Sequence, residues 1–585
     1  MTCRPRPTSR IVAVLAVATL WCMPFPAAAE HIVIQIAGLD DDLEAAVRAN
    51  LELQQYIDRD THPTQIQRLL ERGKDEIRRA LEPYGYYHSQ VTGELLPGGD
   101  RVTASYRVIP GERVIVRDKR VEVLGPGAAL PAVSRAIESF APAVGEPLEH
   151  GLYEDSKAAV NSALQLNGYL DADLERHRVE VTRATLSATI DLRWRSGQRY
   201  RIGAVRFSDA QFPDAFLQRY IPCEPQAPYD IETLLTLQQR LVDADYFATV
   251  SVQPAIDERD AGLVPVDVLL IPAKRTVYTA SAFVSTDAGP GGRLGIERRW
   301  LNTRGHKLGG EVEYSTRVQA YSSYYRIPRP GRQSRLYSIA GGYRDEQTDS
   351  SRSRLARLSV IEALDDWHGY ARTLGLQYLN GDFTVADEQR SSSLLYAEGN
   401  LGRKRANDLV FPSQGLSVTY TARLAAQALL SDTSLLQLRT DAKWIRPVTD
   451  RSRLILRASL GALEAGDFSA LPPELRFFAG GDRSVRGFDY QQIGARNAAG
   501  GVIGGRYLAV ASAEMEYYFV ENWGAALFVD AGDAFNSDLN ANIGAGIGLR
   551  WKSPVGIVRV DLGVPVHTDL PDDGLRIHLM IGPDL

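Results

Sequence analysis

The residues from Thr276 onward show no helical periodicity. This pattern constrains the fold more than any other feature of the sequence. Segments of about ten residues alternate polar with apolar side chains, and turn-forming residues separate the segments. A period of two is that of a β-strand whose two faces meet different surroundings. At about 19 residues for each strand and its connection, these roughly 310 residues accommodate about 16 antiparallel strands.

The alternation is clearest in the last predicted strands. Within 512–519 an apolar outward set opposes a more polar set, namely Ala513, Met515, Tyr517 and Phe519 against Ser512, Glu514, Glu516 and Tyr518. The last strand opposes Leu575, Ile577, Leu579 and Ile581 to Arg576, His578 and Met580. A soluble sandwich has the same period. The helix-free length, the terminal strand and the 26 tyrosines favour a transmembrane β-barrel.

Residues 1–29 have the features of an export signal. They contain a charged head, an apolar run and a small-residue cleavage site: Arg4, Arg6 and Arg10, then Ile11–Phe25, then Ala27–Ala29. We expect cleavage near Glu30 and an exported product. The remaining chain has 63 basic and 72 acidic side chains, and a net charge of −9 argues against a nucleic-acid binder.

The remaining chain also contains a single cysteine, Cys223. One thiol can form neither an internal disulfide nor a thiolate metal cluster. We interpret Cys223 as an ordinary residue near a helix–loop junction.

The amino-terminal half contains an internal repeat of about 80 residues, marked by Tyr86, Tyr169 and Tyr246. An amphipathic helical stretch precedes each tyrosine: Thr64–Leu81, Leu152–Leu166 and Ile231–Leu241. Strand candidates open each unit (His31–Ile36, Val114–Leu124 and Tyr200–Phe207) and close it (Thr103–Ile109, Leu186–Arg193 and Val264–Ile271). The order β-α-α-β-β predicts small α+β modules whose tyrosines pack in their cores. Exposed sheet edges of such modules can accept a strand from another chain.

One long connection, 466–505, separates the strand candidates Leu454–Leu463 and Tyr507–Phe519. It contains FFAGGDRSVRGFDY at Phe477–Tyr490. A loop of about 40 residues in a compact fold is usually functional or disordered. Its aromatic and glycine content argues against disorder.

These features together resemble a known superfamily of barrels with POTRA modules, which includes the BamA, TamA and two-partner-secretion proteins. Three POTRA units would occupy 30–110, 111–196 and 197–273, and the outer-membrane barrel would occupy 274–585. The words Pro472–Phe488 resemble loop six of the TamA family, the outer-membrane subunit of the translocation and assembly module. The superfamily hallmark within them is VRGF, at Val485, Arg486, Gly487 and Phe488.

The resemblance implies that loop six folds back into the barrel and that Arg486 meets carboxylates of the inner wall. Asp530 and Glu514 are the predicted partners. The family's F-x-D-x-G strand is matched by Phe528, Asp530 and Gly532. A guanidinium engages carboxylates as a rigid fork, and its burial without such partners is costly. Less specific matches to family sequence motifs lie at Asn302–Gly305, Phe411–Gly415 and Gly544–Asp561.

The resemblance also implies a function. The protein would lie in the bacterial outer membrane with its POTRA units in the periplasm. Clients such as autotransporters would be inserted through a seam between Val277–Thr286 and Leu575–Ile581, weakened by Gly582 and Pro583. Its partners would be a TamB-like inner-membrane protein, unfolded outer-membrane proteins and lipid, without nucleic acid, cofactor or metal.

The sequence leaves four alternatives to this function. An enzyme is disfavoured because the sequence contains no G-x-S-x-G or H-E-x-x-H motif. A two-partner-secretion transporter would carry two POTRA units and a plug helix, and a BamA protein about five units. A passive porin would not need about 240 periplasmic residues.

Overall fold

The computed structural model describes residues 31–57, 59, 61–98, 101–285, 287–331, 335–408, 410–553, 556–570 and 574–582. The predicted export signal therefore lies outside the described residues. The chain forms two compact units, Met1–Tyr200 with Pro228–Asp230, and Arg201–Ala227 with Ile231–Leu585. Among the described residues, no helix is both long enough and apolar enough to cross a membrane.

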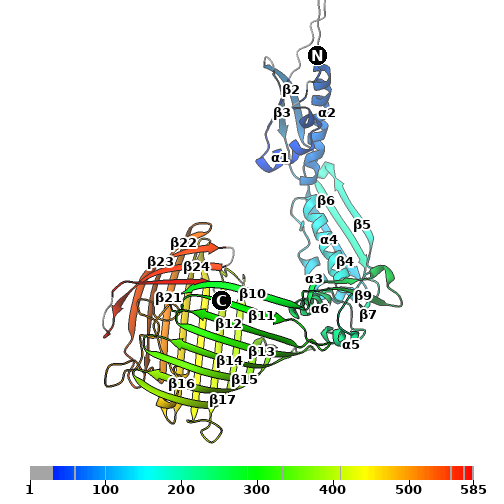
Figure 1. Ribbon diagram of the computed structural model, residues 1–585. Helices are drawn as coiled ribbons and strands as arrows, with labels where there is room; N and C mark the ends of the chain where they lie inside the picture. The colour runs from blue at the N-terminus through cyan, green and yellow to red at the C-terminus, as the bar shows by residue number, and fades with distance from the viewer. Residues whose placement is uncertain are drawn as a thin grey trace, which may run out of the picture. The chain divides into compact units, whose positions relative to one another are not determined.

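The first unit contains repeats 1 and 2. Repeat 1 consists of β1 (His31–Ala37), α1 (Asp41–Asn50), α2 (Pro63–Leu81), β2 (Gln90–Gly98) and β3 (Arg101–Ile109). Repeat 2 consists of β4 (Ile115–Leu124), α3 (Pro131–Glu138), α4 (His150–Leu166), β5 (Asp173–Thr182) and β6 (Ser187–Arg195) (Figure 1). Each repeat forms a three-stranded sheet in which the last strand is central, in the orders β1-β3-β2 and β4-β6-β5.

Helix α2 shows why these segments form helices. Pro63 occupies its first turn, where a missing N–H costs nothing, and the His62 side chain accepts from the Thr64 N–H. Apolar residues spaced three and four apart then place one stripe against the sheet, and Ile66, Leu70 and Ile77 are buried.

Repeat 3 lies in the second unit. It consists of β7 (Arg201–Ser208), α5 (Asp214–Leu217), α6 (Ile231–Asp243), β8 (Phe247–Pro254) and β9 (Leu263–Pro272), with sheet order β7-β9-β8. Tyr246 is buried, as the repeat predicts, but its hydroxyl donates to the Gly305 carbonyl at 2.5 Å. Gly305 belongs to a barrel turn, so this tyrosine also joins repeat 3 to the barrel.

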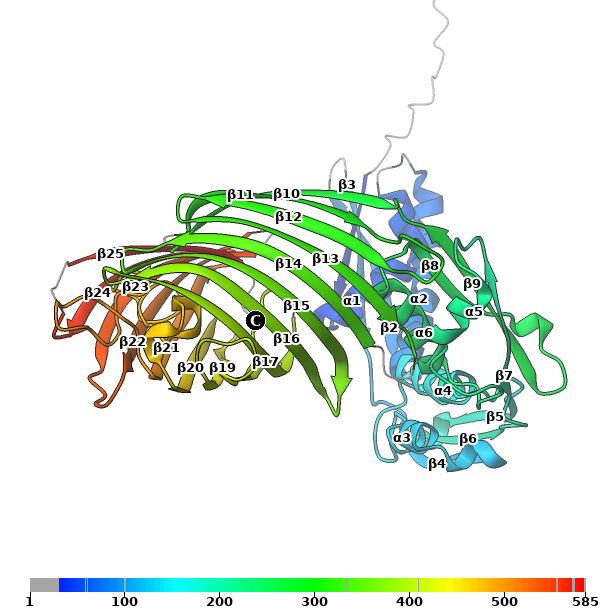
Figure 2. The same ribbon diagram turned by 60° about the horizontal axis from the view of Figure 1, so that its bottom comes forward.

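The remaining strands form one antiparallel sheet of 16 strands, as the sequence predicts. They are β10 (Thr276–Ser285), β11 (Gly289–Arg298), β12 (Lys307–Ser315), β13 (Val318–Arg329), β14 (Arg335–Gln347), β15 (Ser351–Trp367), β16 (Tyr370–Val385), β17 (Glu388–Ala406), β18 (Gly415–Ala425), β19 (Leu435–Thr449), β20 (Ser452–Ala465), β21 (Tyr507–Val520), β22 (Trp523–Phe535), β23 (Asn542–Ser553), β24 (Gly556–His567) and β25 (Arg576–Gly582). The sheet curls into a barrel (Figure 2).

The two ends of this sheet, β10 and β25, lie side by side. In the described part of the chain they are not neighbours in the hydrogen-bonded ladder, so the barrel is nearly closed. Strand β25 begins at Arg576, which leaves the predicted seam residue Leu575 just before it. Thr286, the predicted end of the first strand, lies outside the described residues.

Connections alternate between the two ends of the barrel because consecutive strands are antiparallel. Strand β10 starts where repeat 3 ends. The turns after β11, β17, β19 and β21 therefore share that end, which we call the repeat end. The long connection between β20 and β21 lies at the opposite end.

The predicted faces of the late strands are confirmed. Outward side chains such as Met515, Tyr517 and Phe519 are exposed, whereas Glu514 and Glu516 are buried inside the barrel. An apolar exterior around a charged interior is the arrangement expected of a membrane barrel.

Candidate functional site

Loop six, the connection of residues 466–506 between β20 and β21, is packed inside the barrel. Its apolar side chains share one buried cluster with wall residues: Leu471, Leu475, Phe477, Ala479, Val485, Phe488 and Ile493 against Leu355, Leu379, Leu394, Tyr396, Leu508 and Val510. Isolated bridges between Phe477 and Gly505 and between Ala479 and Ile493 fold the loop on itself. The loop is therefore an internal element with a core of its own.

Glycines allow the backbone of the VRGF motif to pack directly against the backbone of the barrel wall. Gly487 has φ +95°, a conformation that other residues rarely adopt. A Cβ at Gly544 on β23 would lie 1.9 Å from the Arg486 carbonyl oxygen. A Cβ at Gly563 on β24 would lie 2.7 Å from the Gly487 nitrogen. The wall thus lacks side chains where the motif lies against it.

Arg486 is 2% exposed and forks onto Asp530 of β22. Its Nε donates to Asp530 Oδ2 at 2.7 Å, and its Nη2 donates to Asp530 Oδ1 at 3.0 Å. The backbone N–H of Arg486 also donates to Asp530 Oδ2, at 3.0 Å. One carboxylate therefore fixes both the side chain and the backbone of the motif.

Two further carboxylates complete the site. Nη1 of Arg486 donates to Glu514 Oε2 of β21 at 2.7 Å and to Asp561 Oδ2 of β24 at 2.9 Å. The guanidinium carbon lies 3.6 Å from the centroid of the Phe528 ring, which adds a cation–π contact. The structure thus brings together Arg486, Asp530, Glu514 and Phe528, all predicted from the sequence. Gly532, also predicted, continues β22 without touching the guanidinium in any described hydrogen bond or ion pair.

A second arginine shares these carboxylates. Arg550 of β23 is fully buried and contacts Glu514 at 2.6 Å and Glu516 at 2.9 Å, and it also pairs with Asp561. Arg453 pairs with Glu516 at 2.6 Å, and Arg457 lies 3.6 Å from Asp530. Four arginines therefore face four carboxylates, and these eight side chains have no net charge.

Sequence reasoning missed Asp561, Glu516 and Arg550 as members of this network. The alternation places all three on the inner face, and that signal was available. It does not tell which inner-face charges meet, because partners on different strands depend on the stagger of the barrel.

Loop six also contacts the last strand through His578 of β25. The Gly487 N–H donates to His578 Nε2 at 3.0 Å, and His578 Nδ1 lies 2.8 Å from Asp482 Oδ1. Because Nε2 accepts a backbone hydrogen bond, the proton of the neutral ring belongs on Nδ1, from which it is donated to Asp482. Arg576 of β25 pairs with Asp489 of the loop at 2.6 Å.

The same loop touches the first hairpin. The Asp482 N–H donates at 3.3 Å to Asp287, in the turn between β10 and β11. Burial, and then the nearby Asp482 carboxylate, raise the pKa of Asp287 to about 7. Loop six therefore has polar contacts on both sides of the β10–β25 seam.

Four of the predicted seam residues lie on β25, the strand that loop six contacts through His578 and Arg576. Ile577 and Ile581 point outward and are exposed, Leu579 is half-buried, and Gly582 ends the strand. Among the described residues, no group of three or more His, Cys, Asp or Glu side chains is arranged to hold a metal ion. The arrangement anchors a loop and a strand edge.

Comparison with known proteins identifies the architecture. The family described as "Omp85 superfamily domain" matches residues 292–584, half of the chain. The chain belongs to the Omp85 superfamily. The description "POTRA domain TamA domain 1" matches residues 33–110 of this Omp85 protein, and "Surface antigen variable number repeat" matches residues 200–270.

A relative in Nitratidesulfovibrio vulgaris, "Outer membrane protein assembly factor BamA", is 32% identical over 115 residues. The match spans 18% of this chain but only 14% of that relative's length. The crystal structure of Haemophilus ducreyi BamA lacking POTRA domains 1–3 has a TM-score of 0.65 at 16% identity, and the match covers 80% of this chain and 99% of that one. CdiB from Escherichia coli gives a TM-score of 0.47 at 16% identity, over 93% of this chain and 98% of that one. The BamA likeness supports the fold.

Replacing Arg486 with alanine should lower the free energy of unfolding by about 3–5 kcal/mol, because Asp530 would lose its bidentate partner and four buried carboxylates would face three arginines. Arg486→Lys should recover only part of this loss, because an ammonium cannot fork onto Asp530. Denaturant unfolding in detergent micelles checks both values. Arg483→Ala, an exposed position three residues away, is the matched control and should change stability by less than about 0.5 kcal/mol. Equal losses at positions 483 and 486 would contradict the anchor.

The raised pKa of Asp287 predicts a pH dependence. When the pKa of a carboxyl group is higher in the folded than in the unfolded protein, the folded protein becomes more stable as the pH falls through the pKa of the folded state. The melting temperature should therefore rise between pH 8 and pH 6 by more in the parent protein than in Asp287→Asn. Parallel curves would show that Asp287 does not titrate in this range.

Proposed function

We propose that this Omp85 protein is an outer-membrane translocation and assembly factor that inserts client strands at the seam between β10 and β25. The observation that carries the proposal is the incomplete closure of the sheet. Among the described residues, strand β25 faces β24 over seven residue pairs, Ile557–Gly563 against Arg576–Gly582. The strands β16 and β17, in the middle of the wall, face each other over fifteen.

The physical argument concerns unpaired backbone groups in lipid. Each unpaired N–H or C=O group in the hydrocarbon core costs several kcal/mol, which is why spanning sheets close on themselves. Because no ladder joins β10 to β25 in the described part of the chain, an incoming client strand can pair with either edge without first breaking a ladder between them. Loop six limits this pairing because it contacts β25 and the first hairpin.

The finer assignment is a TamA-like role. It is supported by the TamA-type match of repeat 1, by the three repeats that the described residues form, and by the sequence around VRGF. The repeats would lie in the periplasm, and the outer strands of their sheets would bind an inner-membrane protein of the TamB type. Clients would be unfolded outer-membrane proteins such as autotransporters. The partial likeness to a BamA relative favours a general BamA-type insertase as the second candidate.

A disulfide across the seam tests the gate. In a Cys223→Ser background, one cysteine in Thr276–Ser285 and one in Arg576–Gly582 are introduced and oxidised. Client insertion into proteoliposomes should fall to background, because β25 can no longer leave β10, and a reductant should restore it.

The matched control places the cysteines at Val418 and Ala442, which face each other across β18 and β19. This pair ties two strands that the gate does not separate, so insertion should continue under oxidation. Undiminished insertion through the locked seam would refute the gate and leave the TamA or BamA assignment to be argued on other grounds.

A further inference from the structure

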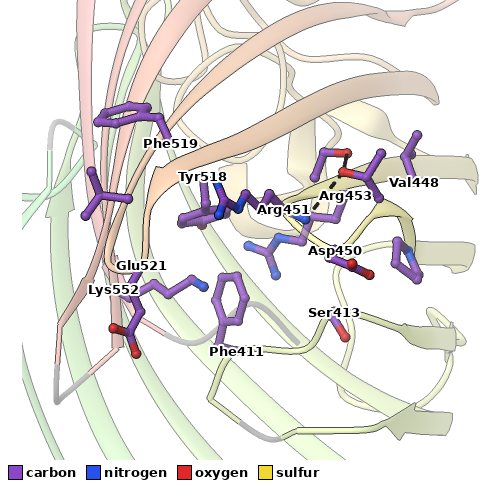
Figure 3. Close-up of a pocket in the computed structure, with 14 residues that line it drawn as sticks. Phe411, Ser413, Val448, Asp450, Arg451, Arg453, Tyr518, Phe519, Glu521 and Lys552 are labelled. Atoms are coloured by element: carbon purple, nitrogen blue, oxygen red, sulfur yellow. Dashed lines mark hydrogen bonds between the residues drawn. The ribbon is translucent and has the colours of Figure 1, made fainter. Parts of the chain in front are cut away.

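A cavity of about 770 Å³ opens at the repeat end of the barrel, the end opposite to the connection between β20 and β21. The turns after β17, β19 and β21 surround it, together with the end of β23 (Figure 3). The turn after β17 contributes Phe411–Gly415, a segment that resembles a family turn motif. This segment has no role in the seam mechanism. Nothing in the proposed function explains why three connections should enclose a space there.

A cation–aromatic stack forms one wall of this cavity. The Lys552 ammonium lies 3.8 Å from the centroid of the Phe411 ring and 4.1 Å from that of the Tyr518 ring. The two rings stand nearly perpendicular, with an interplanar angle of 85°. The electron-rich ring faces therefore hold the ammonium in place.

The neighbouring cations differ in how their charge is balanced. Arg453 also lies over Phe411, but its guanidinium pairs with Glu516 at 2.6 Å. Within the described part of the chain, no ion pair within 4.0 Å joins Lys552 or Arg451 to a carboxylate, although Glu516 and Glu521 act on the Lys552 charge from farther away. Both line the cavity, so two positive charges are available to a ligand. Two acidic side chains, Asp450 and Glu521, line it as well.

The cavity lies at the level where a membrane meets water. Trp551, next to Lys552, stacks on Trp523 with ring centroids 5.8 Å apart, and both rings are exposed on the outer face. Such aromatic girdles mark the headgroup level of a barrel. Val448, Phe519 and Val520 line the cavity and are each at least half exposed, so apolar side chains continue from it toward the lipid.

We propose that this cavity binds the headgroup of a zwitterionic glycerophospholipid from the leaflet at the repeat end. Lys552 and Arg451 bind the phosphate, and Asp450 and Glu521 attract the amine of the headgroup. The acyl chains pass over Val448, Phe519 and Val520. Opposite charges in one open pocket beside an apolar lip match a ligand that carries phosphate, ammonium and hydrocarbon together.

This inference rests on the proposed membrane location but not on client insertion. A protein that binds lipid and fails to insert clients would refute only the gate. A protein that inserts clients and fails to bind lipid would refute only the headgroup site.

The test titrates the purified full chain in detergent with phosphatidylethanolamine and follows binding by native mass spectrometry. Lys552→Gln and Arg451→Gln should each weaken binding about tenfold, the usual effect of losing one charged hydrogen bond. Lys552→Arg should retain it. Arg446→Gln removes an exposed cation at the same end that does not line the cavity, and it should bind like the parent protein.

Heat-dependent electrophoretic mobility checks that every variant folds. Three comparisons then identify the ligand. Phosphatidylglycerol should bind more weakly than phosphatidylethanolamine, because its headgroup lacks the amine; equal binding would overturn the role of the carboxylates. Inorganic phosphate should not displace the lipid at equal concentration, and displacement would make the site one for free phosphate. A lipid affinity that Lys552→Gln leaves unchanged, or tighter binding of an unfolded client peptide, would overturn the proposal.

Discussion

One buried guanidinium organises the inside of this barrel. Arg486 could not remain charged in a narrow interior without partners, because an unpaired buried charge costs several kcal/mol. It obtains them from Asp530, Glu514 and Asp561, which lie on β22, β21 and β24. Three strands must therefore hold their register for one loop residue to be satisfied, and the loop in turn holds those strands together.

The same constraint reaches the seam because Arg486 and Gly487 are adjacent. The first is fixed to Asp530, and the second donates its N–H to His578 on the last strand. A displacement of β25 must break that hydrogen bond or pull on the anchored arginine. The anchor and the strand edge are thus mechanically coupled, and the glycines at positions 544 and 563 keep the distance short.

Much of the fold was readable in the sequence because its signals are local. Helix α2 follows from apolar spacing, and the inner face of β21 follows from strict alternation around Glu514 and Glu516. The number of strands followed from the length of the carboxy-terminal half divided by the typical length of a strand and its connection. Leu575 shows the limit of such reasoning, because the strand starts one residue later, where pairing with Gly563 begins.

The sequence by itself determined which side chains face inward, since a two-residue period is a property of the strand alone. It also indicated Asp530 and Glu514 as partners of Arg486, through a family resemblance. Only the tertiary structure decided that Arg550 and Asp561 complete the network and that Lys552 lies between Phe411 and Tyr518. These contacts join residues on different strands and turns. The stagger and curvature of the closed sheet set the distances between them, and no local pattern encodes either quantity.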